Sequence, residues 1–279
     1  MTVRRLDIGS AVGDLRSAVL RRLARILIRS GTFRRHLGTF NRNYDPDFLH
    51  AARFLRGASD ADALFVRDLV SDARPPHANA DQHQDLWVVH ETGGKRGGFF
   101  VEFGAMDGVA GSNTLLLERE FGWRGILAEP NPVWHDELAR NRTARIDHRC
   151  VFTTSGEHVE FAATKYAGLA TIAKFTGSDG HARSRTEHQL LEIATVSLND
   201  LLATHGAPPG IDYISIDTEG SELAILEAFD FARWDVRLFS IEHNLTVREK
   251  EIDRLMRSHG YEKRFADYAV IDAWYRKTC

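Results

Sequence analysis

The sequence predicts a doubly wound α/β fold, in which a mostly parallel sheet of seven strands carries an antiparallel hairpin at its C-terminal end. Between residues 99 and 259, short apolar runs typical of buried strands alternate with segments whose apolar residues recur at helical spacing. Such alternation favours a parallel sheet covered by helices on both faces. The last two strand-like runs are separated by a very short link, Ala266-Asp267, so we expect them to pair antiparallel.

Composition sets the outer limits of the interpretation. The 279 residues, 43% hydrophobic and 27% charged, suit one large domain with an extension. A net charge of −3 gives no reason to expect a nucleic-acid partner. The two cysteines, Cys150 and Cys279, provide neither a disulfide framework nor zinc-ligand spacing, which favours a reducing cytoplasm.

The first 80 residues predict a helical extension, and residues 81–279 the α/β domain. Residues 10–29 form an amphipathic pattern with many arginines, and two further helices are expected at 47–56 and 60–71. We favour packing of the basic helix on the domain or on a second subunit, hence a homodimer. A membrane-surface helix is the alternative. The apolar run here is broken by arginines and too short to span a bilayer, so we expect neither stable membrane insertion nor a signal peptide.

Each element of the domain follows from a local pattern. Ser112 or Asn113 can cap the helix that follows the first strand, and Pro132 suits the first position of the next helix. The expected strands are 99–103, 124–129, 144–152, 159–162, 192–198, 211–217, 236–242, 261–265 and 269–275. The expected helices are 84–92, 114–121, 132–141, one that ends near residue 206, 221–229 and 247–259. Residues 163–190 predict a long loop, which in a compact domain is usually a lid, a substrate loop or disordered.

The stretch after residue 103 predicts a Rossmann-like nucleotide cradle. A buried strand, a glycine turn at Gly104 and Gly108, and a helix N-terminus follow one another. Met106 stands where a dinucleotide fold would need the glycine that admits a pyrophosphate. We therefore expect a ligand without phosphates, S-adenosylmethionine, over NAD, although an NAD-dependent oxidoreductase is the main enzymatic alternative.

Residues at the carboxyl ends of the strands are candidates for binding this cofactor. Glu129 lies 21 residues beyond Gly108, which suits hydrogen bonds to the ribose hydroxyls; it could also be an ordinary surface carboxylate. Gly104, Ala105 and Gly108 would let the backbone approach the amino-acid half, and Glu102 could hold its ammonium. Ser112, in the turn before the helix, and Asn131, after the second strand, are further candidates. Phe152 could flank the adenine or belong to the core.

Asp217 and Glu242 end neighbouring strands, so their carboxylates could share one side of a cleft. Paired carboxylates are typical Mg²⁺ ligands, and a bound ion could lower the pKa of a substrate hydroxyl. His243 is the candidate general base. The alternative is that Asp217 and Glu219 hydrogen-bond the cofactor or cap the next helix, with His243 in a structural bond.

Four blocks resemble, in order and spacing, the FkbM-type methyltransferases. They are GGKRGGFFVEFGAMDGVAGSNT (93–114), RGILAEPNP (124–132), IDYISIDTEGSELAIL (211–226) and FSIEHN (239–244). The resemblance implies a class I fold, dependence on S-adenosylmethionine, and methylation of hydroxyls on sugars or polyketide-type products. It places Glu102, Gly104, Asp107, Gly108, Asn113 and Glu129 in cofactor blocks and Asp217, Glu219 and Glu242 in active-site blocks.

A looser likeness links the chain to metal-dependent sugar O-methyltransferases, which carry a pair of acids where this chain has Glu242-His243. Residues 81–86 also depart from the Ser-Gln-x-Gly-Gln-Asp segment often seen in relatives. We therefore expect a cytoplasmic S-adenosylmethionine-dependent O-methyltransferase. Its acceptor would be a sugar, an oligosaccharide or a glycosylated natural product. A non-catalytic membrane-surface or scaffold protein is the remaining alternative.

Overall fold

The computed structural model describes residues 62, 65, 75–266, 269 and 271–278. The contacts divide the chain into two units, residues 1–75 with 265–270, and residues 76–264 with 271–279. In the first unit, the ring of Phe65 lies edge-on to that of Phe265, with their centroids 5.2 Å apart. The helices expected at 10–29 and 47–56 lie outside the described residues, and of the helix expected at 60–71 only residues 62 and 65 are described, both helical. The boundary expected at residue 80 stays a prediction.

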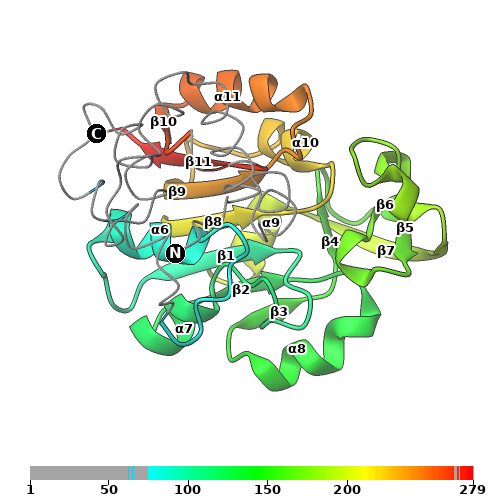
Figure 1. Cartoon of the computed structure of the whole chain (residues 1–279), viewed down its shortest axis with the longest axis horizontal. Helices are drawn as coiled ribbons and strands as arrows, with labels where there is room; N and C mark the ends of the chain where they lie inside the picture. Colours follow the sequence, from blue (N-terminus) through cyan, green and yellow to red (C-terminus); the bar gives the residue numbers. More distant parts are fainter. Residues whose placement is uncertain (1–61, 63–64, 66–74, 267–268, 270, 279) are drawn as a thin grey trace, which may run out of the picture. The chain divides into compact units, whose positions relative to one another are not determined.

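The second unit is built on a seven-stranded sheet, as the sequence predicts (Figure 1). Its strand order is β10-β11-β9-β8-β1-β2-β3. The strands are β1 (Phe99–Phe103), β2 (Arg124–Ala128), β3 (Arg145–Asp147), β8 (Gly210–Ile216), β9 (Asp235–Glu242), β10 (Tyr261–Arg264) and β11 (Asp272–Lys277). Neighbouring strands in the series β9-β8-β1-β2-β3 pair in parallel, whereas β11 is antiparallel to both β9 and β10. The chain winds outward from β1 in one direction and from β8 in the other, so the strand order reverses between these two strands.

The helices account for the continuous apolar character of the strands. They are α6 (Gln84–Thr92), α7 (Leu115–Phe121), η1 (Pro132–Trp134) with α8 (His135–Asn141), α9 (Leu198–Thr204), α10 (Glu222–Glu227) and α11 (Arg248–Ser258). In β8 every residue from Ile211 to Ile216 is buried, as expected for a strand covered on both faces. Ile252 and Met256, one turn apart on α11, belong to the same core, and Trp87 of α6 stacks on Trp274 of β11.

A second, smaller sheet was not expected. It contains β4 (Cys150–Phe152), β7 (His188–Ser197), β5 (His158–Thr164) and β6 (Thr171–Ile172), in that order. The single strand predicted at 144–152 is therefore two strands in different sheets. The predicted loop 163–190 is also folded, since it holds β6, η2 (Ala167–Leu169), η3 (Ala173–Phe175), η4 (Ala182–Arg185) and the start of β7. The link between β10 and β11 spans residues 265–271, longer than expected.

Asp147 marks the point where the chain leaves the main sheet. Arg149 donates hydrogen bonds to its carboxylate from Nε (2.9 Å) and Nη2 (2.6 Å), and Nε2 of His205 lies 2.8 Å from it. Burial opposes ionisation here, but these hydrogen bonds prevail and lower the pKa of Asp147 to about 2. A carboxyl group with a depressed folded-state pKa stabilises the fold above its unfolded pKa, and this stability is lost as the pH falls through the folded value.

We expect Asp147→Asn to lower the free energy of unfolding by about 2 kcal/mol at neutral pH. The difference from the parent should shrink between a pH of about 4 and a pH of about 2, because the parent carboxylate then becomes protonated. Urea unfolding across this range measures it, with the exposed Asp136→Asn as a matched control. A difference that does not vary with pH would contradict the assigned pairing.

Candidate active site

A cavity of about 670 Å³ lies at the carboxyl ends of β1, β2, β8 and β9. This is the place that the reversal of strand order predicts. Of the residues expected at the site, seven line this cavity: Glu102, Gly104, Asn113, Glu129, Asp217, Glu219 and Glu242. Among the described residues, the other expected ones lie outside its lining: Ala105, Asp107, Gly108, Ser112, Asn131, Phe152 and His243. Half of the residues that the sequence predicts for the site therefore line one cavity, and the other half lie outside its lining.

The glycine turn after β1 brings two strand ends together. Gly104 has a φ of 69°, and a Cβ atom there would lie 2.4 Å from the carbonyl oxygen of Asp217. Its amide donates to the carbonyl of Ala128 at 3.1 Å. Met106, also at positive φ, lines the cavity. The turn thus presents backbone and a thioether side chain to a ligand, in keeping with a ligand that has no phosphate.

Glu129 sits at the end of β2 and is 4% exposed. Its carboxylate accepts hydrogen bonds from the amides of Met106 and Asn131, each at 2.8 Å. Burial outweighs these bonds and raises the pKa of Glu129 to about 7. Each oxygen still has a free lone pair, so the group fits the two adjacent hydroxyls of a ribose.

Three carboxylates meet at the ends of β8 and β9. Oxygen atoms of Asp217, Glu219 and Glu242 lie within 4.8 Å of one another; Asp217 is half-buried and the other two are buried. Burial, with the neighbouring acids in addition, holds the pKa values of Asp217 and Glu242 well above their ordinary range. Ionised carboxylates this close repel one another, so Asp217 and Glu242 suit either a shared proton or a divalent ion.

Asp272 and Gln84 belong to this side of the cavity and were missed by sequence reasoning. Asp272 begins β11 directly opposite Glu242 in the ladder, and Gln84 Nε2 donates to its carboxylate. Burial raises the pKa of Asp272 to about 6. The closeness of residues 84 and 272 depends on the antiparallel pairing of β11 with β9, which gives no local pattern to detect.

Glu219 is held from outside the cluster by Arg185, whose side chain is fully buried. Arg185 donates to Glu219 at 2.5 Å and to both oxygens of Asp179 at 2.7 and 2.9 Å. Its Nε donates to the carbonyl of Leu169. The guanidinium therefore ties the folded segment 165–187, which covers one side of the cavity, to the end of β8.

His243 faces away from the cavity lining. Its Nδ1 accepts a hydrogen bond from the amide of Leu245 at 3.2 Å, and its Nε2 lies 3.9 Å from Glu249 of α11. Phe152 packs in the second sheet, where the ammonium of Lys174 lies 4.1 Å from its ring centroid. A catalytic role for His243 and an adenine contact for Phe152 stay predictions, and the placement of these side chains does not bring them to the cavity.

The remaining expected residues shape the loops. Asp107 accepts hydrogen bonds from the amides of Val109 and Ala110, both at 2.8 Å. Asn131 accepts one from Val133 and so caps η1. A side chain at Gly108 would collide with Arg142, because a Cβ there would lie 2.5 Å from its Cγ. These residues position the cavity wall through the backbone.

Comparison with known proteins agrees with this geometry. The Methyltransferase FkbM domain matches residues 102–263, more than half of the chain. No curated protein matches the chain. Within the residues that the structure describes, no helix is long and apolar enough to cross a bilayer.

Three solved structures show partial similarity. A putative RNA methyltransferase PH1948 from Pyrococcus horikoshii is 11% identical over 79% of this chain and 99% of that chain, with a TM-score of 0.35. Precorrin-6y C5,15-methyltransferase from Geobacter metallireducens is 10% identical over 73% and 90%, with a TM-score of 0.37. A TehB-like SAM-dependent methyltransferase from Corynebacterium glutamicum is 10% identical over 82% and 99%, also with a TM-score of 0.37.

The domain match, on a doubly wound sheet with a cavity at its strand ends, shows an S-adenosylmethionine-dependent methyltransferase. The chain belongs to the FkbM methyltransferase family. This membership decides against the NAD-dependent oxidoreductase considered from the sequence.

Proposed function

We propose that this methyltransferase transfers its methyl group to a hydroxyl of a sugar, an oligosaccharide or a glycosylated natural product. The observation that carries the proposal is the cluster of Asp217, Glu219 and Glu242, which lines the same cavity as Gly104 and Glu129. A hydroxyl is a weak nucleophile unless its proton is removed. The cavity thus combines a cofactor cradle with groups that can take this proton.

The chain's own residues supply alignment and proton transfer. Gly104 and Glu129 would hold the cofactor, which when bound would supply an electrophilic methyl group. An acceptor hydroxyl held between the cofactor and the cluster would give its proton to an ionised carboxylate of Asp217 or Glu242. Its oxygen would bond to the methyl carbon as the sulfur–methyl bond breaks, and S-adenosylhomocysteine, with a neutral thioether, would be the leaving group. Holding both reactants in one enclosed site supplies much of the rate enhancement.

Asp217 and Glu242 also fit a Mg²⁺ ion. Hard cations prefer carboxylate oxygens, and a dication would relieve the repulsion that keeps the pKa values of both groups high. Glu219 fits less well, because Arg185 already neutralises it. Such an ion would lower the pKa of the acceptor hydroxyl.

The walls of the cavity support a polyhydroxylated acceptor. Gln82, Asn244 and Asp272 line it, and Oε1 of Gln82 is buried with no hydrogen-bond partner among the described residues. Acceptor groups of this kind suit sugar hydroxyls as donors. The exposed ring of Tyr166, at the covering segment, offers an apolar face to a sugar ring. A homodimer in the cytoplasm stays a prediction from the sequence.

The test is methyl transfer by the full chain from labelled S-adenosylmethionine to a panel of neutral sugars, oligosaccharides and glycosylated polyketides. We expect label to enter an O-methyl group. If Mg²⁺ takes part, EDTA lowers turnover and Mg²⁺ restores it; turnover unchanged by EDTA removes the metal from the proposal. Label on nitrogen or carbon would contradict O-methylation. Binding of S-adenosylhomocysteine with no transfer to any acceptor would favour the scaffold alternative.

A further inference from the structure

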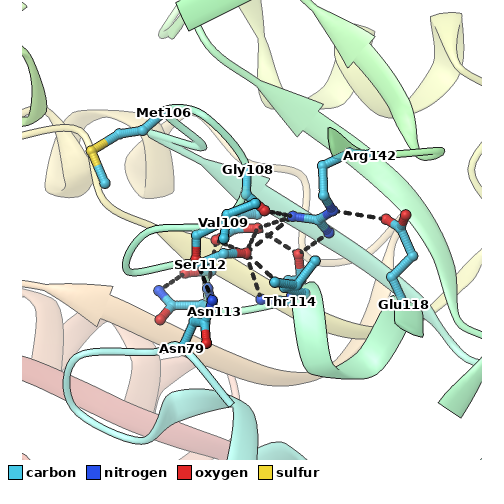
Figure 2. A network of polar contacts seen from close by, with 12 residues as sticks. Asn79, Met106, Gly108, Val109, Ser112, Asn113, Thr114, Glu118 and Arg142 are labelled. Carbon is cyan, nitrogen blue, oxygen red and sulfur yellow. Dashed lines mark hydrogen bonds and ion pairs between the residues drawn. The ribbon is translucent and has the colours of Figure 1, made fainter. Parts of the chain in front are cut away.

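A buried arginine behind the glycine turn makes an unusually complete set of contacts. Arg142 follows α8 directly, and its side chain is fully buried. It donates to the carbonyl of Gly108 at 3.1 Å, to Ser112 Oγ at 3.0 Å, to Thr114 Oγ1 at 2.8 Å and to Glu118 at 3.0 Å (Figure 2). One guanidinium thus ties the end of α8 to the glycine turn, to the segment 112–114 and to α7.

Glu102 is engaged by the same network. Its carboxylate accepts hydrogen bonds from the amide of Asn113 at 2.6 Å, from Ser112 Oγ at 3.1 Å and from Thr114 Oγ1 at 2.5 Å. Arg142 lies 3.6 Å from it. The carboxylate expected to hold the cofactor's ammonium is therefore engaged in shaping segment 112–114.

Asn113 is the residue that this arrangement presents to the cavity. Its amide hydrogen bonds to Glu102, and its Nδ2 donates to Ser215 Oγ of β8 at 2.8 Å. Its Oδ1 is buried and finds no hydrogen-bond partner within the described part of the chain, although Asn113 lines the cavity and is 7% exposed. A buried carbonyl oxygen without a donor is costly, so a bound ligand is the natural source of one.

The position of this oxygen and the charges of the side chains around it indicate which hydrogen-bond donor it would accept from. Asn113 is anchored to β8, whereas Glu129, the ribose candidate, stands at the end of β2 on the other side of β1. With the ribose at Glu129 and the methyl group directed toward the acids at the ends of β8 and β9, Asn113 would lie on the side of the amino-acid half. The buried group of Glu102, Arg142 and Glu118 carries one net negative charge beside it, which favours a cation.

We propose that Oδ1 of Asn113 accepts a hydrogen bond from the ammonium of the cofactor's amino-acid half. In this proposal Arg142 is the positioning residue, which holds Asn113 in place through Glu102 and Ser112. The inference rests on S-adenosylmethionine being the cofactor. It assigns the ammonium contact to the side-chain amide of Asn113 instead of the carboxylate of Glu102, where the sequence suggested it.

The test compares two ligands in calorimetry with the full chain. S-adenosylhomocysteine carries the amino-acid half, and 5′-methylthioadenosine lacks it. We expect Asn113→Ala to weaken S-adenosylhomocysteine about tenfold to a hundredfold and to leave 5′-methylthioadenosine unchanged. Asn113→Asp, which keeps an acceptor oxygen, should restore binding. Equal weakening of both ligands, or of neither, would overturn the role of Asn113.

Arg142→Met keeps the apolar stem and removes the donors. We expect it to weaken S-adenosylhomocysteine more than 5′-methylthioadenosine, and to add little when Asn113 is already alanine, since the two residues act through one contact. Weakening of both ligands in the same ratio would reduce Arg142 to a general structural role and overturn the proposal for it. Should Arg142→Met not fold, Glu118→Gln removes its anchor on α7 and must show the same selectivity.

Arg119→Met is the matched control. Arg119 is an exposed arginine on α7 whose Nη2 donates to the carbonyl of Asn141, next to Arg142. We expect both ligands to bind this variant as they bind the parent. If the parent itself fails to bind S-adenosylhomocysteine, the cofactor assignment fails; if the parent binds it and the ligand ratio stays the same in the variants, only the present inference fails.

Discussion

Replacing Asp217 by asparagine is expected to lower methyl transfer by at least about a hundredfold and to leave the affinity for S-adenosylhomocysteine nearly unchanged. The variant loses a carboxylate that can take the acceptor's proton or bind a cation together with Glu242. Asp217 approaches the glycine turn through its backbone, since its carbonyl oxygen faces Gly104, and the substitution leaves this backbone unchanged. The loss should therefore appear in kcat and not in cofactor binding.

Stability separates this outcome from misfolding. Burial and the neighbouring acids already disfavour the charged form of Asp217, so a neutral amide should fold at least as well as the parent. Thermal unfolding measures this, and Asp136→Asn on the exposed surface of α8 is the matched control for turnover. Full turnover in Asp217→Asn would remove the cluster from the reaction and leave the O-methyltransferase proposal without its main support.

The strands that build the site were predictable because their environment is simple. A strand such as β8, buried on both faces, has a continuous apolar sequence, and its acidic end marks the point where it meets the cavity. The positions of Glu129 and Gly104 beside the cavity could also be predicted from local sequence. Their positions follow from the length of one strand-turn-helix unit, which is local in sequence.

What sequence reasoning missed depends on contacts between distant residues. The fold of segment 165–187 rests on Arg185, whose partner Glu219 is 34 residues away. The partners Gln84 and Asp272 are 188 residues apart. The periodicity of apolar residues gives no signal of such pairs. Residues 165–187 therefore appear as a loop in the sequence, and nothing around Asp272 indicates a functional site.

Side-chain direction is the other feature that the sequence did not show. Glu102 was correctly placed beside the cavity, but the sequence could not show that Ser112, Asn113 and Thr114 would surround its carboxylate. His243 follows Glu242, the last residue of β9, and neighbouring residues of an extended chain point in opposite directions. Its ring accordingly lies toward Glu249 of α11 and not toward the cluster.

Gly104→Ala, which adds one methyl group, is expected to lower the free energy of unfolding by about 3 kcal/mol or more. It should also weaken the binding of S-adenosylhomocysteine at least about tenfold. Two costs combine at this position. The φ of 69° is unfavourable for any residue with a Cβ, and that atom would lie 2.4 Å from the carbonyl oxygen of Asp217, a backbone atom that cannot rotate away. The end of β1 must then separate from the end of β8, which opens the cofactor cradle.

Gly122 provides the control that isolates the second cost. It ends α7 with a φ of 65°, nearly that of Gly104, but a Cβ added there would have no atom of the described residues within 4 Å. Gly122→Ala should therefore lose only about 1 kcal/mol and bind S-adenosylhomocysteine normally. Urea unfolding and calorimetry of the two variants measure the difference. A backbone contact as tight as that at Gly104 leaves no room for a methyl group, so the two variants should differ. Equal losses in both would mean that the close approach of β1 and β8 does not define the cofactor site.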